Sequence, residues 1–266
     1  MCKKTLYLFL FLVALLPRFS LAQQPDTVVS APQLQQDSLY QHQPEKIKRH
    51  YKGLLLVPAT FIIYGAASLN VSGLKGVNDK VKEEVYLEGN HKMHHLDNYL
   101  QYAPGLMVYG LNLAGIKGKH NFVDRTAIYA MANIIMGSTV TVTKHLTHET
   151  RPDGSNDLSF PSGHTATAFA AAEFLMREYQ DVSLWYGVAG YAMAATTGYL
   201  RMLNNRHWFG DIVAGAGVGI LSTELAYSLY PSVKRIFHSK KTDMATLILP
   251  TYQQGAFGLS MVHRFK

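Results

Sequence analysis

The chain has 266 residues, which suits one domain with appendages. Hydrophobic residues make up 48% of it and charged residues only 16%, below the roughly 25% of a typical soluble domain, yet the mean hydropathy of −0.01 is low for a protein made mostly of membrane spans. The formal net charge of +7 comes without a basic patch interleaved with aromatic residues, which argues against nucleic acid as the partner.

Residues 1–22 have the pattern of a signal peptide. Lys3 and Lys4 form a basic start, Leu6–Leu16 is an apolar run, and Ser20 and Ala22 supply small residues for cleavage after position 22. The run is shorter than the roughly 20 residues that a spanning helix needs. Cleavage would remove the only cysteine of the chain and three cations, which lowers the formal charge from +7 to +4.

Residues 23–50 are polar, rich in Gln and Pro and without hydrophobic period, as in a flexible linker. The region 51–232 is predicted to be an all-α domain, a six-helix bundle associated with a membrane. The six helices are expected at 53–69, 96–116, 122–146, 164–179, 183–203 and 207–230. Closely spaced small residues, as in AGAGVG, favour tight helix packing. In the tail, 233–266, apolar and polar residues alternate about a Gln-Gln-Gly turn, which predicts a β-hairpin over 245–265.

The first candidate site is KHLTHETRP, residues 144–152. Lys144 and Arg151 lie seven residues apart, two helical turns, so they share a face, and Pro152 ends the helix. Two cations at a helix end suit an anion with several oxygens, which an arginine can bind bidentately. Taken alone, a solvated basic end that stabilises the helix C-terminus is the simpler explanation.

The second candidate site is the string PSGH, in which Pro161, Ser162 and Gly163 begin the next helix. Unpaired backbone N–H groups of a first helical turn, with the Ser162 hydroxyl, form an anion site, and glycine lets the backbone approach closely. His164 lies within reach of an anion held there. A serine cap followed by a chance histidine remains the alternative for this string alone.

The third candidate site is LRMLNNRHWFGD, residues 200–211. Arg201 lies near the end of one helix, and His207 and Asp211 are at i and i+4 on the next, so the carboxylate lies beside the imidazole. Such a carboxylate fixes the histidine tautomer and leaves the other nitrogen free to attack. A structural His–Asp pair is the alternative.

Together the three strings supply three cations, a helix N-terminus and two histidines, only one of which has an aspartate beside it. That division suggests a nucleophile and a general acid acting on phosphorus in a fixed cationic site. In order and spacing the strings resemble the motifs of the type 2 phosphatidic acid phosphatase superfamily, over about residues 144–211. The resemblance is carried by Lys144 to Arg151-Pro152 with six residues between, Pro161-Ser162-Gly163-His164, and Arg201 with His207 and Asp211.

The resemblance implies a role for each residue. His207 would attack phosphorus to form a phosphohistidine, Asp211 would orient His207, and His164 would protonate the leaving oxygen and then activate water. The phosphate oxygens would be bound by Lys144, Arg151, Arg201, Ser162 and the Gly163 amide. No metal and no cofactor are implied. The sequence departs from the motif at Leu200, where the family has serine, so one supporting hydrogen bond is expected to be missing.

Other polar residues have simpler explanations. The group His91, His94 and His95 lacks a carboxylate at helical spacing and is expected to be a polar loop. Glu173 and Arg177, at i and i+4, are expected to form an intrahelical ion pair or to mark the membrane-edge end of the helix, and not to be catalytic. The polar residues Asp97, Asn98, Gln101, Asp124 and Arg125 lie inside candidate spans and count against full burial in lipid.

The topology can be predicted only in part. Lys117, Lys119, His120 and Arg125 predict a positive-inside, cytoplasmic turn, which would put the three candidate sites on the periplasmic side of the inner membrane. A six-span scheme begins in the cytoplasm, whereas a cleaved signal would leave residue 23 outside. Three arrangements would remove this conflict. The N-terminal apolar run is retained, or helix 53–69 does not span the membrane, or the bundle is soluble in the periplasm and only associated with the membrane.

The sequence therefore predicts a metal-independent phosphatase of an envelope lipid, with no obligate protein partner evident. The candidate substrates are lipid A phosphate, undecaprenyl diphosphate and phosphatidylglycerol phosphate. Two alternatives stay open: a vanadium-dependent haloperoxidase, which shares the anion site, and a non-enzymatic lipid-binding envelope protein.

Overall fold

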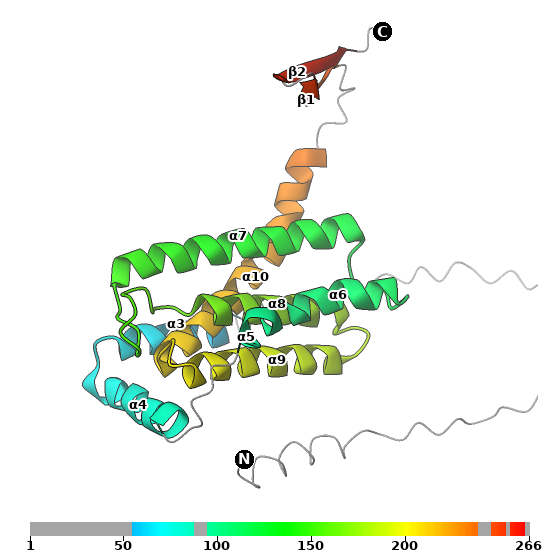
Figure 1. Cartoon of the computed structure of the whole chain (residues 1–266). Coiled ribbons are helices and arrows are strands. Elements are labelled where there is room, and N and C mark those ends of the chain that lie inside the picture. Colours follow the sequence, from blue (N-terminus) through cyan, green and yellow to red (C-terminus); the bar gives the residue numbers. More distant parts are fainter. Residues whose placement is uncertain (1–54, 88–94, 239–245, 254–255, 264–266) are drawn as a thin grey trace, which may run out of the picture. The chain divides into compact units, whose positions relative to one another are not determined.

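The computed structural model of the chain describes residues 55–87, 95–238, 246–253 and 256–263 (Figure 1). The predicted signal peptide and linker lie outside these ranges, as do His91 and His94. The eight described α-helices are α3 Leu56–Ser68, α4 Ser72–Lys82, α5 Asp97–Leu100, α6 Ala103–Leu113, α7 Phe122–Thr147, α8 Gly163–Tyr179, α9 Leu184–Leu203 and α10 Phe209–His238. A π-helical turn, Glu83–Leu87, follows α4. The predicted all-α fold class is confirmed.

Eight α-helices are described where six were predicted, and the differences have local causes. The expected helix 96–116 is two helices, α5 and α6, because Pro104 has no N–H to donate to the carbonyl of Leu100 and its ring crowds that turn. Helix α4 was not predicted at all. Its spacing of Leu74, Val77 and Val81 is helical, but a polar, glycine-containing sequence surrounds these residues and hides the pattern.

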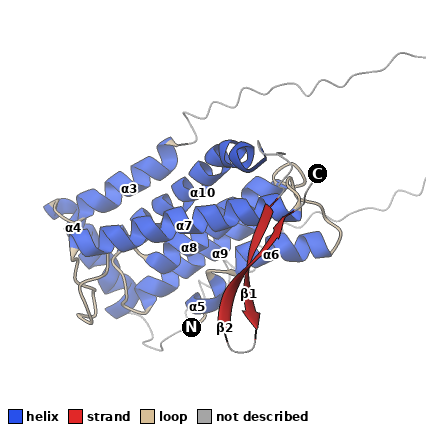
Figure 2. Ribbon diagram, turned by 90° about the horizontal axis from the view of Figure 1, so that it is seen from above, coloured by secondary structure: helices blue, strands red, loops and turns tan. Residues whose placement is uncertain are grey.

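Two strands form the antiparallel hairpin that the alternation predicted. They are β1 Thr246–Gln253 and β2 Ala256–His263, and Gln253 pairs with Ala256 next to the turn (Figure 2). The helix before the hairpin extends further than expected, because α10 continues to His238, beyond the predicted domain boundary at 232.

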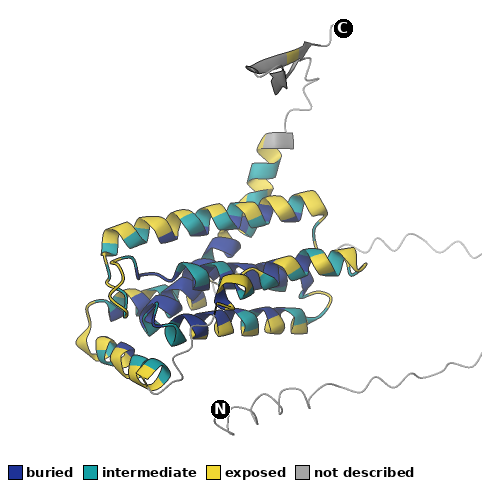
Figure 3. Ribbon diagram, in the orientation of Figure 1, coloured by how far each residue is buried: buried dark blue, intermediate teal, exposed yellow. Residues whose placement is uncertain are grey.

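Helix α8 is the centre of the bundle. Twelve of its 17 residues are buried, and it packs against α6, α7, α9 and α10 (Figure 3). Five of the buried residues are alanine, and Phe174 and Leu175 are fully buried toward the C-terminal half. Small side chains let neighbouring helices come close, so the ends of these helices can gather in one place.

Helices α8 and α10 approach each other closely at two glycines of the predicted AGAGVG segment. A Cβ on Gly215 would lie 2.6 Å from the carbonyl oxygen of Ser162, and a Cβ on Gly219 would lie 2.3 Å from that of Ala166. There is no room for a Cβ atom at either position, so both positions require glycine. The tight helix packing predicted from these small residues is confirmed.

Two described helices, α7 and α10, are long and apolar enough to cross a membrane. Only 22% of the most apolar window of α7 is buried within the protein, and its exposed side chains include Ile134, Val142 and Leu146. Helix α3, with 13 residues, is too short to cross by itself, and it qualifies only together with the segment Ser72–Leu87, to which it is bent by 93°. We therefore treat the chain as a membrane protein.

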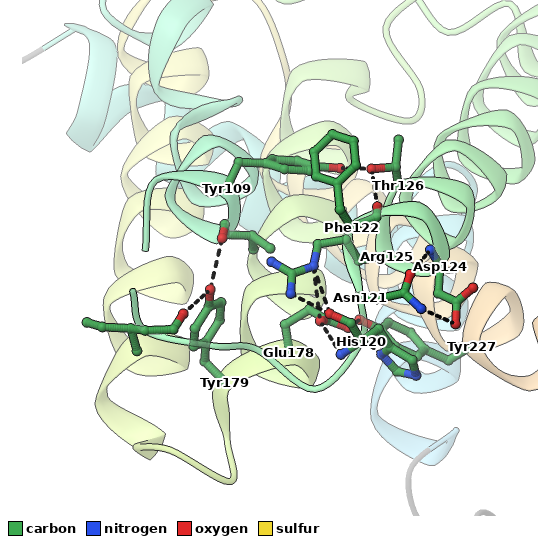
Figure 4. A network of polar contacts seen from close by, with 12 residues as sticks. Tyr109, His120, Asn121, Phe122, Asp124, Arg125, Thr126, Glu178, Tyr179 and Tyr227 are labelled. Carbon is green, nitrogen blue, oxygen red and sulfur yellow. Dashed lines mark hydrogen bonds and ion pairs between the residues drawn. The ribbon is translucent and has the colours of Figure 1, made fainter. Parts of the chain in front are cut away.

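Two of the four basic residues of the predicted positive-inside turn are bound by a carboxylate of the bundle. Arg125 is 2% exposed and lies 3.8 Å from the carboxylate of Glu178, and His120 Nδ1 lies 2.7 Å from the same carboxylate (Figure 4). Tyr227 of α10 also donates to Glu178. The carboxylate at the end of α8 thus holds Arg125 in the interior and binds the partly exposed His120, and Lys117 and Lys119 are the exposed cations of the turn.

The expected ion pair between Glu173 and Arg177 is confirmed at 2.9 Å. The pair is also part of a larger buried group, because Arg177 binds Glu224 of α10 and Tyr191 of α9 donates to Glu173. These contacts join α8, α9 and α10 between the two ends of the bundle.

Candidate active site

The residues of the three candidate sites gather at one end of the bundle. They come from the C-terminal ends of α7 and α9, the N-terminal ends of α8 and α10, and the loops between these helices. We call them the helix-end cluster: Lys144, Arg151, Ser162, Gly163, His164, Arg201, His207 and Asp211. A backbone hydrogen bond of 3.0 Å from Ser162 N–H to the carbonyl of Asp211 joins two of the helix ends directly.

His207 and Asp211 are both buried, and His207 Nδ1 lies 3.4 Å from Asp211 Oδ2. The same carboxylate oxygen accepts hydrogen bonds from the Ser159 hydroxyl at 2.5 Å and from Trp208 N–H at 2.9 Å. Ser159 was not predicted, since no spacing rule links it to a residue 52 positions away. The carboxylate is thus fixed on the Nδ1 side of the ring.

Burial lowers the pKa of His207 to about 4, against the opposing effect of Asp211, and the charges of Lys144 and Arg201 lower it further. The imidazole is therefore neutral near pH 7. With Nδ1 directed at the carboxylate, the lone pair of a neutral ring is on Nε2, which is the protonation state that a nucleophile needs.

The loop between α9 and α10 makes a sharp turn that places His207. Asn205 has φ +55°, in the left-handed region that asparagine tolerates better than most residues. Arg206 N–H donates to the carbonyl of Arg201 at 3.0 Å, which closes the turn. The chain thereby reverses within a few residues, and His207 comes beside the start of α8.

The three cations of the cluster have few partners. Arg151 Nε and Arg201 Nε are buried and lack a hydrogen-bond partner within the described part of the chain. Lys144 Nζ donates to the carbonyls of Leu158 and Ser159 at 2.5 and 3.1 Å. Burial and the charge of Arg201 lower the pKa of Arg151, so the cations repel one another. A buried guanidinium nitrogen that lacks a hydrogen-bond partner is stabilised by an anion.

Ser162 is the N-cap of α8. Its hydroxyl oxygen accepts from the hydroxyl of Thr165 at 2.9 Å and from Thr165 N–H at 3.4 Å. The side chain therefore caps the helix, as the alternative explanation of the string PSGH predicts. Its own proton stays available to an acceptor. At Gly163 a Cβ would meet only Val140, at 3.7 Å, which leaves the backbone accessible at the start of the helix.

His164 lies on the first turn of α8, and its Nε2 is 3.0 Å from Asn98 Oδ1 of α5. The neighbouring Asp97 accepts from Arg201 Nη1 at 2.7 Å. Neither residue was predicted, because both lie more than 40 positions before the first motif and read only as polar residues in a candidate span. Burial and the charge of Arg201 lower the pKa of His164 to about 4, and an anion bound beside it would raise the pKa again.

Helix α4 packs on the loops of the site. Lys82 Nζ donates to the carbonyl of Pro152 at 2.9 Å and lies 5.2 Å from the centre of the Trp208 ring. Asn78 accepts from Gly210 N–H at 2.9 Å. A small pocket between α4 and these loops has His207 in its wall. Among the residues that the structure describes, no group of three His, Cys, Asp or Glu is placed to hold a metal ion.

One further ion pair lies next to the cluster. Arg206, the residue before His207, is bound by Asp153 at 2.9 Å, and both side chains are partly exposed. This pair joins the loop after α7 to the loop before α10.

The model of the PAP2 superfamily matches residues 125–235, a range that contains the whole helix-end cluster. The resemblance to this superfamily is confirmed over these residues. Among curated relatives, the lipid A 1-phosphatase of Porphyromonas gingivalis is 39% identical over 152 residues, which is 57% of this chain and 34% of that protein. The chain therefore matches about a third of the length of this relative.

A second relative is the bacitracin transport permease protein BcrC of Bacillus licheniformis. It is 28% identical over 185 residues, 64% of this chain and 85% of that protein. Among solved structures, a transmembrane PAP2 type phosphatidylglycerolphosphate phosphatase from Bacillus subtilis is 18% identical, with a TM-score of 0.46 over 68% of this chain and 98% of that one.

Proposed function

We propose that this protein is a metal-independent phosphatase that hydrolyses a phosphate monoester or diphosphate of an envelope lipid. The observation that carries the proposal is the buried His207, whose Nδ1 lies 3.4 Å from Asp211, in the same cluster as Arg151 and Arg201, whose buried Nε atoms lack a partner within the described residues. A phosphate group supplies the negative charge and the several acceptor oxygens that such a site requires.

In the first step the phosphate lies against Arg151, Arg201 and the start of α8. His207 Nε2 attacks phosphorus, a nitrogen–phosphorus bond forms, and the bond from phosphorus to the leaving oxygen breaks. His164 donates a proton to that oxygen, so the lipid leaves as an alcohol or as a phosphate. Asp211 stabilises the positive charge that develops on the His207 ring.

In the second step water hydrolyses the phosphohistidine. His164, now neutral, takes a proton from the water. The water oxygen bonds to phosphorus, and the nitrogen–phosphorus bond breaks. Inorganic phosphate leaves, and both histidines return to their starting states. The cations around the site stabilise the charge on the phosphoryl oxygens in both steps.

The lipid class rests on the membrane helices and on the relative named a lipid A 1-phosphatase. The candidate substrates are lipid A phosphate, undecaprenyl diphosphate and phosphatidylglycerol phosphate. We propose that the protein lies in the inner membrane with the helix-end cluster toward the periplasm. Lys117 and Lys119, at the other end of α7 and α8, then lie on the cytoplasmic side.

The test is phosphate release from a panel of these three lipids by the full-length protein in detergent, with EDTA present. Wild type should release phosphate and His207→Ala should not. The exposed His145, at the end of α7, offers the matched control, and His145→Ala should keep wild-type activity. Rapid quenching with a radiolabelled substrate should trap an acid-labile phosphoprotein in wild type.

Four outcomes would contradict the proposal. Activity that EDTA abolishes would mean a metal takes part in the reaction, and full activity in His207→Ala would mean another nucleophile. Halide oxidation supported by vanadate, in place of inhibition by vanadate, would favour the haloperoxidase. Lipid binding without phosphate release by wild type would favour the non-enzymatic alternative.

A further inference from the structure

Helix α5 lies outside the three motifs but contributes two consecutive side chains to the site. Asp97 is 1% exposed and pairs with Arg201, and Asn98 contacts His164. The helix itself packs against α6, α8 and α9. Gln101, just after α5, donates from its side chain to the backbone carbonyl of Asn98 at 2.9 Å, which steadies that turn.

The ion pair between Asp97 and Arg201 anchors α5. Its two atoms are 2.7 Å apart and both side chains are buried, so the pair is shielded from water. Arg201 uses Nη1 for this contact, while its Nε has no partner among the described residues. One edge of the guanidinium thus faces α5, and the other edge remains for a phosphate.

The contact between Asn98 and His164 decides which ring nitrogen carries a proton. The amide oxygen of Asn98 is an acceptor only, so the hydrogen bond requires a proton on His164 Nε2. The neutral ring then has its lone pair on Nδ1. A ring held in this way can gain and lose a proton at Nδ1 without changing its orientation.

Resting on the proposed function, we propose that Asn98 is a positioning residue of the phosphatase reaction. It holds His164 with Nε2–H toward α5, so that Nδ1 donates the proton to the leaving oxygen and later takes one from water. Asp97 anchors the helix that carries Asn98.

The charged groups around His164 support a dependence of its protonation on the bound phosphate. Arg201 of α9, Arg151 of the loop before α8 and Lys144 of α7 lower its pKa, and Asp97 of α5 raises it. A phosphate on the three cations would cancel much of their effect. The ring can therefore be protonated with substrate bound and neutral once the product has left.

The first test reads the tautomer directly. The nitrogen chemical shifts of ¹⁵N-histidine-labelled full-length protein in detergent, with His164 assigned by His164→Gln, should show Nε2–H for His164. Asn98→Ala should lose this preference, and Tyr99→Ala should keep it, because Tyr99 is 76% exposed on the same helix. An Nδ1–H tautomer in wild type would overturn the proposal, whatever the activity of the protein.

The second test uses the leaving group. An alkyl phosphate needs a proton on its leaving oxygen, whereas an aryl phosphate with an acidic phenol does not. Asn98→Ala should lower kcat for the alkyl phosphate roughly tenfold to a hundredfold, a part of the effect of general acid–base catalysis. The pre-steady-state burst of phenolate should stay within about threefold of wild type, by the same reasoning. Asn98→Asp, which keeps an acceptor, should restore kcat and move the alkaline limb of the pH profile upward.

The outcomes separate the two proposals. Equal losses on both substrates, or no loss on either, would overturn the role of Asn98 while leaving the phosphatase intact. A wild type that shows the Nε2–H tautomer but releases no phosphate would instead count against the phosphatase. If Asn98→Ala has a much lower Tm than wild type, two other variants still test the role of Asn98. Asn98→Asp does so through the pH profile of kcat, and Tyr99→Ala through the tautomer of His164.

Discussion

The backbone N–H of Ser162 donates to the backbone carbonyl of Asp211 at 3.0 Å, so the first turns of α8 and α10 are held together without any side chain. This bond places the start of α8, with His164, beside His207 and Asp211. It forms only because Gly215 leaves room for the carbonyl of Ser162 one turn further along α10. The geometry of the site therefore depends on how closely two helices approach.

Gly215→Ala should destabilise the protein and lower activity together. The added Cβ would lie 2.6 Å from a backbone oxygen, and the strain of such overpacking costs about 1–3 kcal/mol. Thermal melting in detergent should show a lower Tm. Gly137→Ala is the matched control, because a Cβ there meets nothing within 4 Å, and its Tm should be unchanged or higher. An unchanged Tm in Gly215→Ala would mean that α8 and α10 leave room for a Cβ atom at this position.

Ser159→Ala should lower kcat roughly tenfold with little change in KM. The variant removes a 2.5 Å hydrogen bond to Asp211, and hydrogen bonds to charged groups contribute about 1.5–3 kcal/mol. The carboxylate would then orient His207 less well. Steady-state kinetics on the active lipid provide the measurement, with the exposed Ser155→Ala as control. Equal kcat values for Ser159→Ala and wild type would show that Trp208 N–H alone fixes the carboxylate.

The acid stability of the protein should depend on His207. Its pKa is about 4 in the folded protein and about 6.5 when unfolded, so between these values the unfolded state binds more protons. The contribution of the neutral His207 to stability is therefore fully present above pH 6.5 and is lost as the pH falls toward 4. His207→Gln should reduce this fall in melts recorded across the range, whereas the exposed His145→Gln should not. Parallel curves for wild type and His207→Gln would mean that His207 is not buried as a neutral ring.

Arg206 should affect diphosphate substrates more than monoesters. It precedes His207 and is partly exposed next to the cluster, where its charge lies near that of Arg151. A second phosphate would compete for it with Asp153. Arg206→Gln should raise KM for a lipid diphosphate at least severalfold and leave Tm nearly unchanged, since exposed ion pairs contribute about 0–1 kcal/mol. Arg235→Gln, an exposed cation near the end of α10, is the control. Equal effects on both substrate types would place the second phosphate elsewhere.

Much of this protein follows from its sequence. The 3.6-residue periodicity and the small residues of 122–230 determine helices and their packing, and the three strings place eight residues at helix ends, where unpaired backbone groups and a few side chains can meet an anion. These are local properties, because helix ends are set by caps, prolines and the chain next to them. The alternation in 245–265 likewise predicts a hairpin from neighbouring residues alone.

Only the tertiary structure shows which distant residues join the cluster. Asp97, Asn98 and Ser159 have no spacing relation to the motifs, and they reach the site because α5 packs on α9 and the loop before α8 folds onto α10. The sequence places Arg125 in a basic turn and inside a candidate span, but it does not show that Glu178, 53 residues later, lies 3.8 Å from it in the interior. Partners brought together by helix packing leave no periodic trace in the sequence, because packing depends on shape and distance and not on separation along the chain.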